Sequence, residues 1–479
     1  MNRIMFLALA ATLLPIVSTA AETSDKKPLL AGAATANITP WLGDGLVGNF
    51  GTPPPAKSIH DELHARCFVL DDGDTRIALV VIDSLYVSRE VLDDAKRQIT
   101  EATGLPADRM LMSSTHTHTS VAARWPNPLK PEKEFTEYQR FLAHRIADGV
   151  QNAIYNLQPA RVAWGTVDLP GQVFCRRWLM NAGSAVYSPF GELEQAKMNP
   201  GNRPDLLEPT SPIDPQIAFL AIETLEGQPL GLLANYSLHY VGGTRPNEVS
   251  ADYFAMFADR VQELLDADRL APPFVAAMSN GTSGNINNND YSKPRERRKP
   301  YEQMRLVADQ CAEAVVGAYG KLEWHDHVPL DMRQQELELG VRKPTPAQLA
   351  HAKKVLADPE KRDEFPHERS YAGRAIQQLE SPDTVSVILQ AVRIGDLGIS
   401  AIPFEVFTET GLQLKASNPF KPSFTMELAN GGYGYLPTPE QHRLGGYETW
   451  LGTNKVEVQA SVKIADTLLE MFEELAQTP

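Results

Sequence analysis

Apolar runs and amphipathic segments alternate in the first part of the chain and predict a strand–helix–strand unit. Residues 75–82 form an apolar run that is typical of a buried strand, and this run ends at Asp83. An amphipathic helix is predicted over 88–103, and a second strand over 109–115 ends at His116. A right-handed crossover of this length makes the two strands parallel. Asp83 and His116 are therefore expected at the carboxyl edge of one sheet, where open α/β sheets usually bind ligands.

The same two patterns continue along the rest of the chain. Further strands are predicted over 217–224, 229–238, 274–278, 385–394 and 397–402, and further helices over 135–157, 251–266, 301–319, 405–416 and 456–475. No repeat and no Pro- or Gly-rich linker divides the chain, which favours one large domain over 30–479. The expected fold class is α/β, with mixed sheets flanked by helices. The charged segment 340–384, with a predicted helix over 345–357, is interpreted as an insertion or lid.

The first twenty residues have the pattern of a secretory signal peptide. Arg3 gives a positive start, residues 6–17 are apolar, and Ser18-Thr19-Ala20 supplies small residues for cleavage. The apolar run is short for a membrane span, and no later stretch is predicted to be transmembrane. Residues 1–20 are therefore predicted to be a signal peptide, and the mature protein to be exported, either periplasmic or secreted.

Charge and cysteine content exclude several classes of protein. The chain has 45 Lys and Arg against 60 Asp and Glu, and the resulting net charge of -15 argues against a nucleic-acid partner. Cys67, Cys175 and Cys311 allow at most one disulfide within the chain, so the fold must be held by its hydrophobic core. No CxxC pair is present, so a thiolate zinc site is not indicated.

The triplet His116-Thr117-His118 is the sharpest local signal for chemistry. In an extended chain, residues two apart point to the same face, so both imidazoles could meet one metal ion. Alternatively, one of the two could bind the metal while the other handles protons. The plainer interpretation is a Ser- and Thr-rich turn with two solvated histidines.

Two more candidates follow apolar runs, as His116 does. His239 follows the run over 229–238, and Glu405 follows 397–402. Each alone is more often structural or solvated. Together with His116 they would place two imidazoles and a carboxylate at one sheet edge, which is the ligand set of many catalytic zinc sites. The sequence thus indicates a metal site at the carboxyl ends of strands.

Four other segments carry weaker signals. The Gly-rich turn 279–285, which contains Ser283, could bind an oxyanion through backbone N–H groups, or could be only a tight turn. Tyr435 and Tyr447 lie in Gly- and Tyr-rich segments that could face a pocket or be exposed turns. Arg176 could contact an anion or an amide, although paired arginines are usually solvated.

The order of these segments resembles the neutral/alkaline (non-lysosomal) ceramidase family. The similarity runs from about residue 30 to the C-terminus and rests on the segments 58–66, 114–119, 234–239, 404–411 and 428–452. The resemblance implies the catalytic domain of a zinc amidase that cleaves the N-acyl bond of ceramide. The zinc ligands that it implies are His116, His239, Glu405 and Tyr435.

The resemblance also implies roles for four further residues. His118 would handle protons or substrate beside the metal, and Tyr447 would polarise the scissile carbonyl group. Arg176 would be the pocket arginine, and Ser283 would bind substrate. This chain departs from the family at Gly281 and Gly284, where the family has Asp and Pro. It ends so soon after Tyr447 that no C-terminal immunoglobulin-like domain is expected.

The resulting hypothesis is an exported zinc-dependent hydrolase that cleaves an N-acyl amide bond by metal-activated water. The expected partner is a small-molecule or lipid substrate, with transient contact to a membrane surface and no obligate protein partner. One alternative is a metal-dependent esterase or deacylase that acts on a carbohydrate or peptide. A non-catalytic exported binding protein and a purely structural zinc site are two more. Manganese or iron could replace zinc in such a ligand set.

Overall fold

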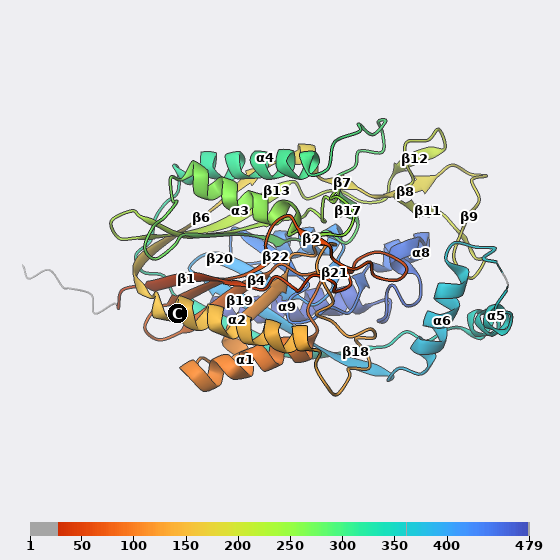
Figure 1. The fold of residues 1–479 in the computed structure, drawn as a ribbon, viewed down its shortest axis with the longest axis horizontal. Helices are drawn as coiled ribbons and strands as arrows, with labels where there is room; N and C mark the ends of the chain where they lie inside the picture. Colours follow the sequence, from red (N-terminus) through yellow and green to blue (C-terminus); the bar gives the residue numbers. More distant parts are fainter. Residues whose placement is uncertain (1–26, 361, 478–479) are drawn as a thin grey trace, which may run out of the picture.

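The computed structural model describes residues 27–360 and 362–477, and Figure 1 shows how they are arranged. The predicted signal peptide, residues 1–20, lies outside the described residues. Within them, no helix is both long and apolar enough to cross a membrane. All three cysteines are buried free thiols, so packing and hydrogen bonds hold this fold without a disulfide.

The largest element is an eight-stranded mixed sheet. Its strands, in spatial order, are β16 (Val275–Asn280), β14 (Pro229–Tyr236), β13 (Gln216–Thr224), β6 (Gln158–Asp168), β1 (Leu30–Asn37), β3 (His64–Asp71), β4 (Arg76–Ile82) and β5 (Met110–Ser114). The β4–β5 and β14–β16 pairs are parallel, and the other pairs are antiparallel. The parallel β4–β5 pair confirms the predicted strand–helix–strand unit.

A second, four-stranded sheet packs against the first. Its order is β18 (Leu330–Gly340), β19 (Thr384–Ile394), β20 (Leu397–Ile402) and β22 (Ser423–Glu427), with only the β20–β22 pair parallel. One buried cluster joins the inner faces of both sheets, and it includes Leu79 and Val81 of β4 with Val392 and Ile399 of the second sheet. The two sheets therefore share a core.

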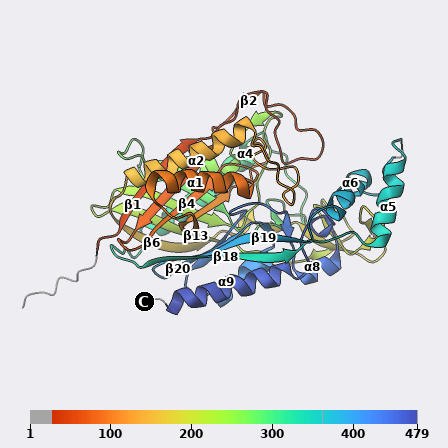
Figure 2. The same ribbon diagram turned by 90° about the horizontal axis from the view of Figure 1, so that it is seen from below.

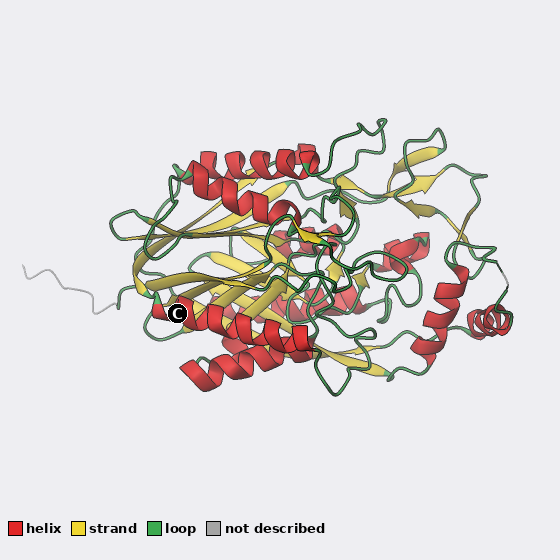
Figure 3. Ribbon diagram, viewed as in Figure 1, coloured by secondary structure: helices red, strands yellow, loops and turns green. Residues whose placement is uncertain are grey.

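Helices cover the outer face of each sheet, which gives four layers (Figure 2), and Figure 3 distinguishes the helices from the strands by colour. The helices are α1 (Arg89–Thr103), α2 (Glu137–Tyr155), α3 (Asp252–Leu264), α4 (Glu302–Tyr319), α7 (Thr408–Ser417), α8 (Pro439–Leu444) and α9 (Ala460–Gln477). Along β4, Ala78, Val80 and Ile82 pack under α1 and α2, while the residues between them face the second sheet. Because both faces are buried, the strand is one continuous apolar run.

The charged segment 340–384 is a pair of helices between two antiparallel strands. The helices α5 (Pro346–Ala357) and α6 (Glu368–Leu379) pack on each other through Ala352, Val355, Ala372 and Ala375. They lie at one end of the molecule, beyond the turn that would otherwise join β18 to β19 (Figures 1 and 2). This placement fits an insertion into a hairpin, and its function as a lid stays a prediction.

Short strands connect these layers near the carboxyl ends of the main strands. They are β2 (Ser58–Ile59), β7 (Phe174–Cys175), β8 (Arg177–Met180), β9 (Val186–Tyr187), β10 (Leu193–Glu194), β11 (Ala196–Met198), β12 (Leu206–Pro209), β15 (Glu248–Val249), β17 (Ile286–Asn287), β21 (Glu405–Val406) and β23 (Tyr435–Leu436). The predicted α/β fold class with mixed sheets is confirmed. The helix predicted over 405–416 begins only at Thr408, because Glu405 pairs in β21 with Tyr435 of β23.

Asp252 should make stability depend on pH. Its buried carboxylate accepts hydrogen bonds from the backbone N–H groups of Val241, Gly242 and Tyr253, and so ties the loop after β14 to α3. Burial raises the pKa of Asp252 to about 6, although these hydrogen bonds oppose the rise. A folded-state pKa above the unfolded value contributes stability at low pH that is lost as the pH rises through about 6.

We expect unfolding experiments at pH 4 and pH 7 to show this loss of stability. Relative to Asp252→Asn, the wild-type protein should lose roughly 2–3 kcal/mol of unfolding free energy over that interval, from a shift of about two pKa units. The asparagine amide lacks one hydrogen-bond acceptor at every pH. The informative quantity is therefore how the difference in unfolding free energy between the two proteins changes with pH. A difference that stays constant with pH would contradict this expectation.

Candidate metal centre and active site

Three of the predicted site residues follow the carboxyl ends of strands from both sheets. His116 comes two residues after β5, His239 three residues after β14, and Glu405 three residues after β20. His116 has a φ of 68°, in the left-handed region that side chains other than glycine rarely adopt. Such backbone strain is often found where function fixes a side chain. The turn after β5 thus aims His116 toward the other two residues.

Four side chains converge at this point. Nε2 of His116 lies 3.2 Å from Nε2 of His118 and 3.2 Å from Oε2 of Glu405. The same carboxylate oxygen lies 3.8 Å from Nε2 of His239. The ligand atoms of the three histidines all lie within 4.8 Å of one another. Ligands about 2.0–2.1 Å from a tetrahedral zinc stand roughly 3.3 Å apart, so this spacing suits one shared cation.

Backbone hydrogen bonds fix the tautomers of two of these histidines. Nδ1 of His116 lies 2.9 Å from the carbonyl oxygen of Leu85, and Nδ1 of His239 lies 3.1 Å from that of Ser283. A carbonyl oxygen only accepts hydrogen bonds, so each Nδ1 must carry the proton. In the neutral imidazole, each Nε2 is then the acceptor nitrogen, and both lie beside Oε2 of Glu405. Hydrogen bonds of this kind are typical of metal-ligating histidines.

Burial and charge set the protonation of the site in favour of a cation. Burial lowers the pKa of His118 and of His239 well below the ordinary value, and nearby cations and imidazoles lower both further. Burial alone would raise the pKa of Glu405, but His116, Tyr435 and Arg176 together hold it below its usual value. Oε2 of Glu405 is buried and has no hydrogen-bond donor. A buried carboxylate oxygen without a donor, facing imidazole lone pairs, is well suited to a divalent metal ion.

Two tyrosines complete the predicted set on one side of this cluster. Tyr435 is the register partner of Glu405 in the β21–β23 pair. Tyr447 begins a short 3₁₀ helix, and the two tyrosine rings lie 5.7 Å apart, edge to face. Burial raises the pKa of both hydroxyl groups, so both remain protonated at neutral pH in this environment.

Ser283 lies behind His239. Its Oγ lies 3.1 Å from Nδ1 of His239 and donates a hydrogen bond of 2.7 Å to Oε1 of Glu427. Both Ser283 and Glu427 are fully buried. The predicted contact of Ser283 with substrate stays a prediction; the contacts present here orient His239.

Close packing accounts for one of the glycines where the chain departs from the family pattern. A Cβ atom at Gly284 would lie 2.5 Å from the carbonyl oxygen of Glu405. The Gly284 N–H donates to the carbonyl oxygen of Val406 at 2.8 Å. The absence of a side chain at 284 therefore lets the turn before β17 press directly against β21, which carries Glu405.

Arg176 and its neighbour Arg177 are buried rather than solvated. Nη1 of Arg176 lies 3.3 Å from Nε2 of His239, and its Nε donates to Oε1 of Glu448 at 2.9 Å. Arg177, which has no exposed surface, donates to the other oxygen of Glu448 at 2.6 Å. One carboxylate thus holds two guanidinium groups beside the candidate metal centre.

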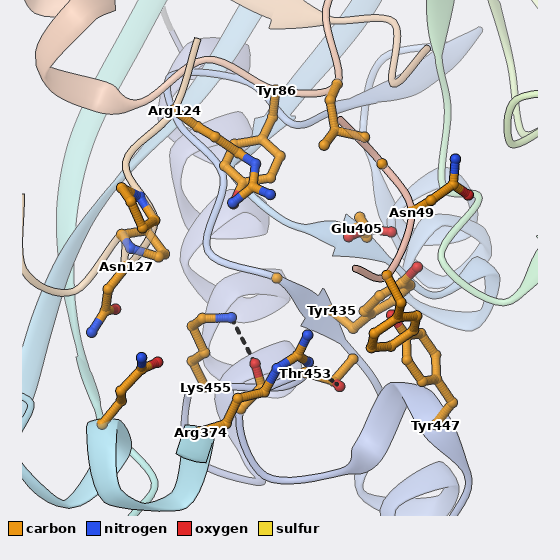
Figure 4. Close-up of a pocket in the computed structure, with 18 of the residues that line it drawn as sticks. Asn49, Tyr86, Arg124, Asn127, Arg374, Glu405, Tyr435, Tyr447, Thr453 and Lys455 are labelled. Carbon is orange, nitrogen blue, oxygen red and sulfur yellow. Dashed lines mark hydrogen bonds between the residues drawn. The ribbon is translucent and has the colours of Figure 1, made fainter. Parts of the chain in front are cut away.

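A pocket of about 220 Å³ opens onto the cluster (Figure 4). His116, His118, Glu405, Tyr435 and Tyr447 all line it. His118 is held against the ring of Tyr240, with ring centres 3.7 Å apart. His239 and Arg176 instead line a second cavity. The structure therefore brings every predicted site residue to one place, although His239, Ser283 and Arg176 do not line this pocket.

Several residues of the site were not identified from the sequence. Glu427 ends β22, the parallel neighbour of β20, so the strand-end pattern that singled out Glu405 applied to it as well. Glu448 follows Tyr447 directly, but nothing local indicates that it pairs with arginines about 270 residues earlier. Arg124, Arg374 and Lys455 also line the pocket, but none of them belongs to a recognisable sequence motif.

Ser283→Ala should weaken metal binding without unfolding the chain. The variant removes one of two groups that orient His239 and takes the hydroxyl donor from Glu427. Losing such a supporting partner typically costs about 10–100-fold in metal affinity. Competition with a coloured chelator would measure this change, and Ser292→Ala, on an exposed loop, is the control. Equal affinities in the two variants would contradict the orienting role.

Comparison with known proteins places these features in a family. Residues 29–314 match the family model described as neutral/alkaline non-lysosomal ceramidase, N-terminal. A neutral ceramidase from Pseudomonas aeruginosa is 22% identical over 350 residues, which are 66% of this chain and 47% of that protein. The chain thus spans about half the length of the curated relative that it matches.

Solved structures share the fold. A structure titled as a ceramidase complexed with C2 matches with a TM-score of 0.69 and 17% identity, covering 94% of this chain and 76% of that one. The neutral ceramidase from Pseudomonas aeruginosa matches with a TM-score of 0.66 and 18% identity, covering 94% and 75%. At these identities, the similarity shows the fold alone.

Proposed function

Because the chain belongs to the neutral/alkaline non-lysosomal ceramidase family, we propose that it is a metal-dependent hydrolase that cleaves an N-acyl amide bond. The substrate class is ceramide or a related N-acyl compound. The family match and the ceramidase-like fold support hydrolysis, and zinc is the metal that we propose.

The observation that carries this proposal is the convergence of acceptor atoms at the pocket wall. Two histidine nitrogens with fixed lone pairs and a carboxylate oxygen without a donor face one point. Their proposed role, with Tyr435, is to hold the metal. When bound, a metal such as zinc acts as a Lewis acid and brings the pKa of bound water to about 7.

The remaining residues would then bind and orient the amide. The Tyr447 hydroxyl, kept protonated by burial, can donate a hydrogen bond to the scissile carbonyl oxygen as negative charge develops there. His118 is neutral and lines the same pocket, so it can accept a proton and pass it to the leaving nitrogen. Ser283 would orient His239 from behind.

A second candidate is an esterase or deacylase that uses the same centre on a more polar substrate. The polar pocket lining favours it, since the apolar lining residues other than tyrosine and glycine are Phe50, Leu85, Pro126 and Pro128. A substrate with two long alkyl chains needs a larger apolar surface than these residues supply. A non-catalytic binding protein would keep the metal centre but lack turnover.

Product analysis on three substrates tests the proposal. Purified full-length protein with bound metal would be incubated with ceramide, with a short N-acyl amine and with the matching ester. Release of the amine from either amide supports the proposal. Cleavage of the ester alone would favour the second candidate, and no turnover of any of the three would favour a binding protein.

A further inference from the structure

The pocket beside the candidate metal centre has an excess of positive charge. Three cationic side chains line it, Arg124, Arg374 and Lys455, against the single carboxylate of Glu405. Glu405 already faces the histidines and is assigned to the metal. This balance is the reverse of that of the whole chain, which has 60 acidic and 45 basic residues. The pocket is therefore a positive site on an acidic protein.

Neutral groups hold all three cations in place. Arg124 donates to the Tyr86 hydroxyl at 3.2 Å, and Lys455 donates to the carbonyl oxygen of Gly452 at 2.8 Å. Arg374 donates to the Thr453 hydroxyl at 3.4 Å. Within the described ranges 27–360 and 362–477, none of the three cations forms an ion pair with a carboxylate. Their charge remains available to a ligand.

Arg374 and Lys455 approach the pocket from two separate elements. Arg374 comes from α6, in the charged segment between β18 and β19, and its guanidinium lies over the rings of Phe50 and Tyr371. Lys455 comes from the turn before α9, and both side chains bond to residues of the 452–453 turn. Figure 4 shows both of them, with Arg124, around the pocket. Helix α6 thus contributes one positive charge to the pocket.

Burial and the two nearby guanidinium groups disfavour a positive charge on Lys455. Burial lowers the pKa of Lys455 to about 7, and repulsion from Arg374 and Arg124 adds to this effect. An anion placed among them would relieve the repulsion and restore the charge of Lys455. Charge-assisted hydrogen bonds to arginine and lysine are the strongest that side chains make with carboxylates and phosphates.

We propose that the substrate carries a negatively charged group, such as a carboxylate, sulfate or phosphate, which Arg124, Arg374 and Lys455 bind while the acyl bond lies at the metal centre. This inference rests on the proposed hydrolysis and narrows its substrate class to acidic N-acyl compounds. The polar lining and small volume of the pocket agree with such a substrate.

Calorimetric titration with a pair of unreactive ketones tests this inference. The first is a γ-keto acid with a pentyl chain, in which methylene replaces the amide nitrogen. The second is the same ketone with a methyl group in place of the carboxylate. For the metal-loaded full-length protein, we expect the keto acid to bind roughly 10–100-fold more tightly. Lys354→Gln, on the exposed surface of α5, should leave both affinities unchanged.

Two pocket variants identify where the carboxylate binds. Arg374→Gln and, separately, Lys455→Met should remove most of the preference for the keto acid and leave the affinity for the neutral ketone unchanged. Equal affinities in the wild-type protein would overturn the inference. A preference that persists in both variants would also overturn it, because the carboxylate would then bind the metal. Since these ketones are not cleaved, a failure of hydrolysis would count against the proposed function alone.

Discussion

His116→Ala should abolish metal binding and reduce N-acyl hydrolysis by about three orders of magnitude or more. His116 is the central residue of the cluster, with Nε2 at 3.2 Å from both His118 and Glu405. Its removal leaves the buried carboxylate and His239 with too few ligands for tight binding. Without the metal, hydrolysis also loses its activated water.

His118→Ala should separate metal binding from catalysis. In the proposed mechanism His118 moves protons, so this variant should keep its metal while its turnover falls by about 10²–10⁴-fold. His144→Ala is the control for both substitutions, because His144 is exposed on α2. Metal content by mass spectrometry and turnover would be measured on the same samples. A His116→Ala protein that is active without metal would rule out the mechanism, and loss of metal from His118→Ala would make His118 a ligand.

Glu448→Ala should be among the most destabilising single substitutions in this chain. The Glu448 carboxylate has no exposed surface and accepts hydrogen bonds from two buried arginines, Arg176 and Arg177. Its removal leaves two guanidinium charges without a counter-charge in the interior. Breaking a buried pair in this way typically costs about 3–5 kcal/mol of unfolding free energy.

An exposed ion pair provides the matched control for this substitution. Glu440 pairs with Arg443 on the surface of α8, with side-chain exposures of 70% and 75%. Exposed pairs contribute little, so Glu440→Ala should have an effect below about 1 kcal/mol. Urea unfolding of both variants gives the comparison. Similar midpoints for the two would show that Glu448 does not stabilise the fold as described.

The hydrophobic pattern predicted part of each backbone layer. Strands such as β4 are buried on both faces, and such runs are distinct in sequence because few polar residues interrupt them. The pattern did not predict strands β1, β3, β6 and β18, and after β20 it predicted a helix from Glu405 where the short strand β21 begins. Pairing of β21 with β23 is a contact between residues 30 positions apart, and helical periodicity carries no information about it.

The site residues that follow the ends of predicted strands could be predicted from the sequence. His116, His239 and Glu405 each follow an apolar run, and the structure brings all three together. Burial of Arg176 and Arg177 was missed, because the carboxylate that makes it possible, Glu448, is distant in sequence. A long-range ion pair allows a charged residue to be buried. The residues next to it in the sequence do not indicate this.

Paired measurement of metal content and N-acyl hydrolysis tests most directly whether the protein is a metal-dependent hydrolase. The same purified sample would be assayed as isolated, after chelation, and after addition of zinc, manganese or iron. We predict about one metal ion per chain, loss of hydrolysis with the metal, and recovery when one metal is restored. Undiminished hydrolysis by the metal-free protein would contradict a metal-dependent mechanism.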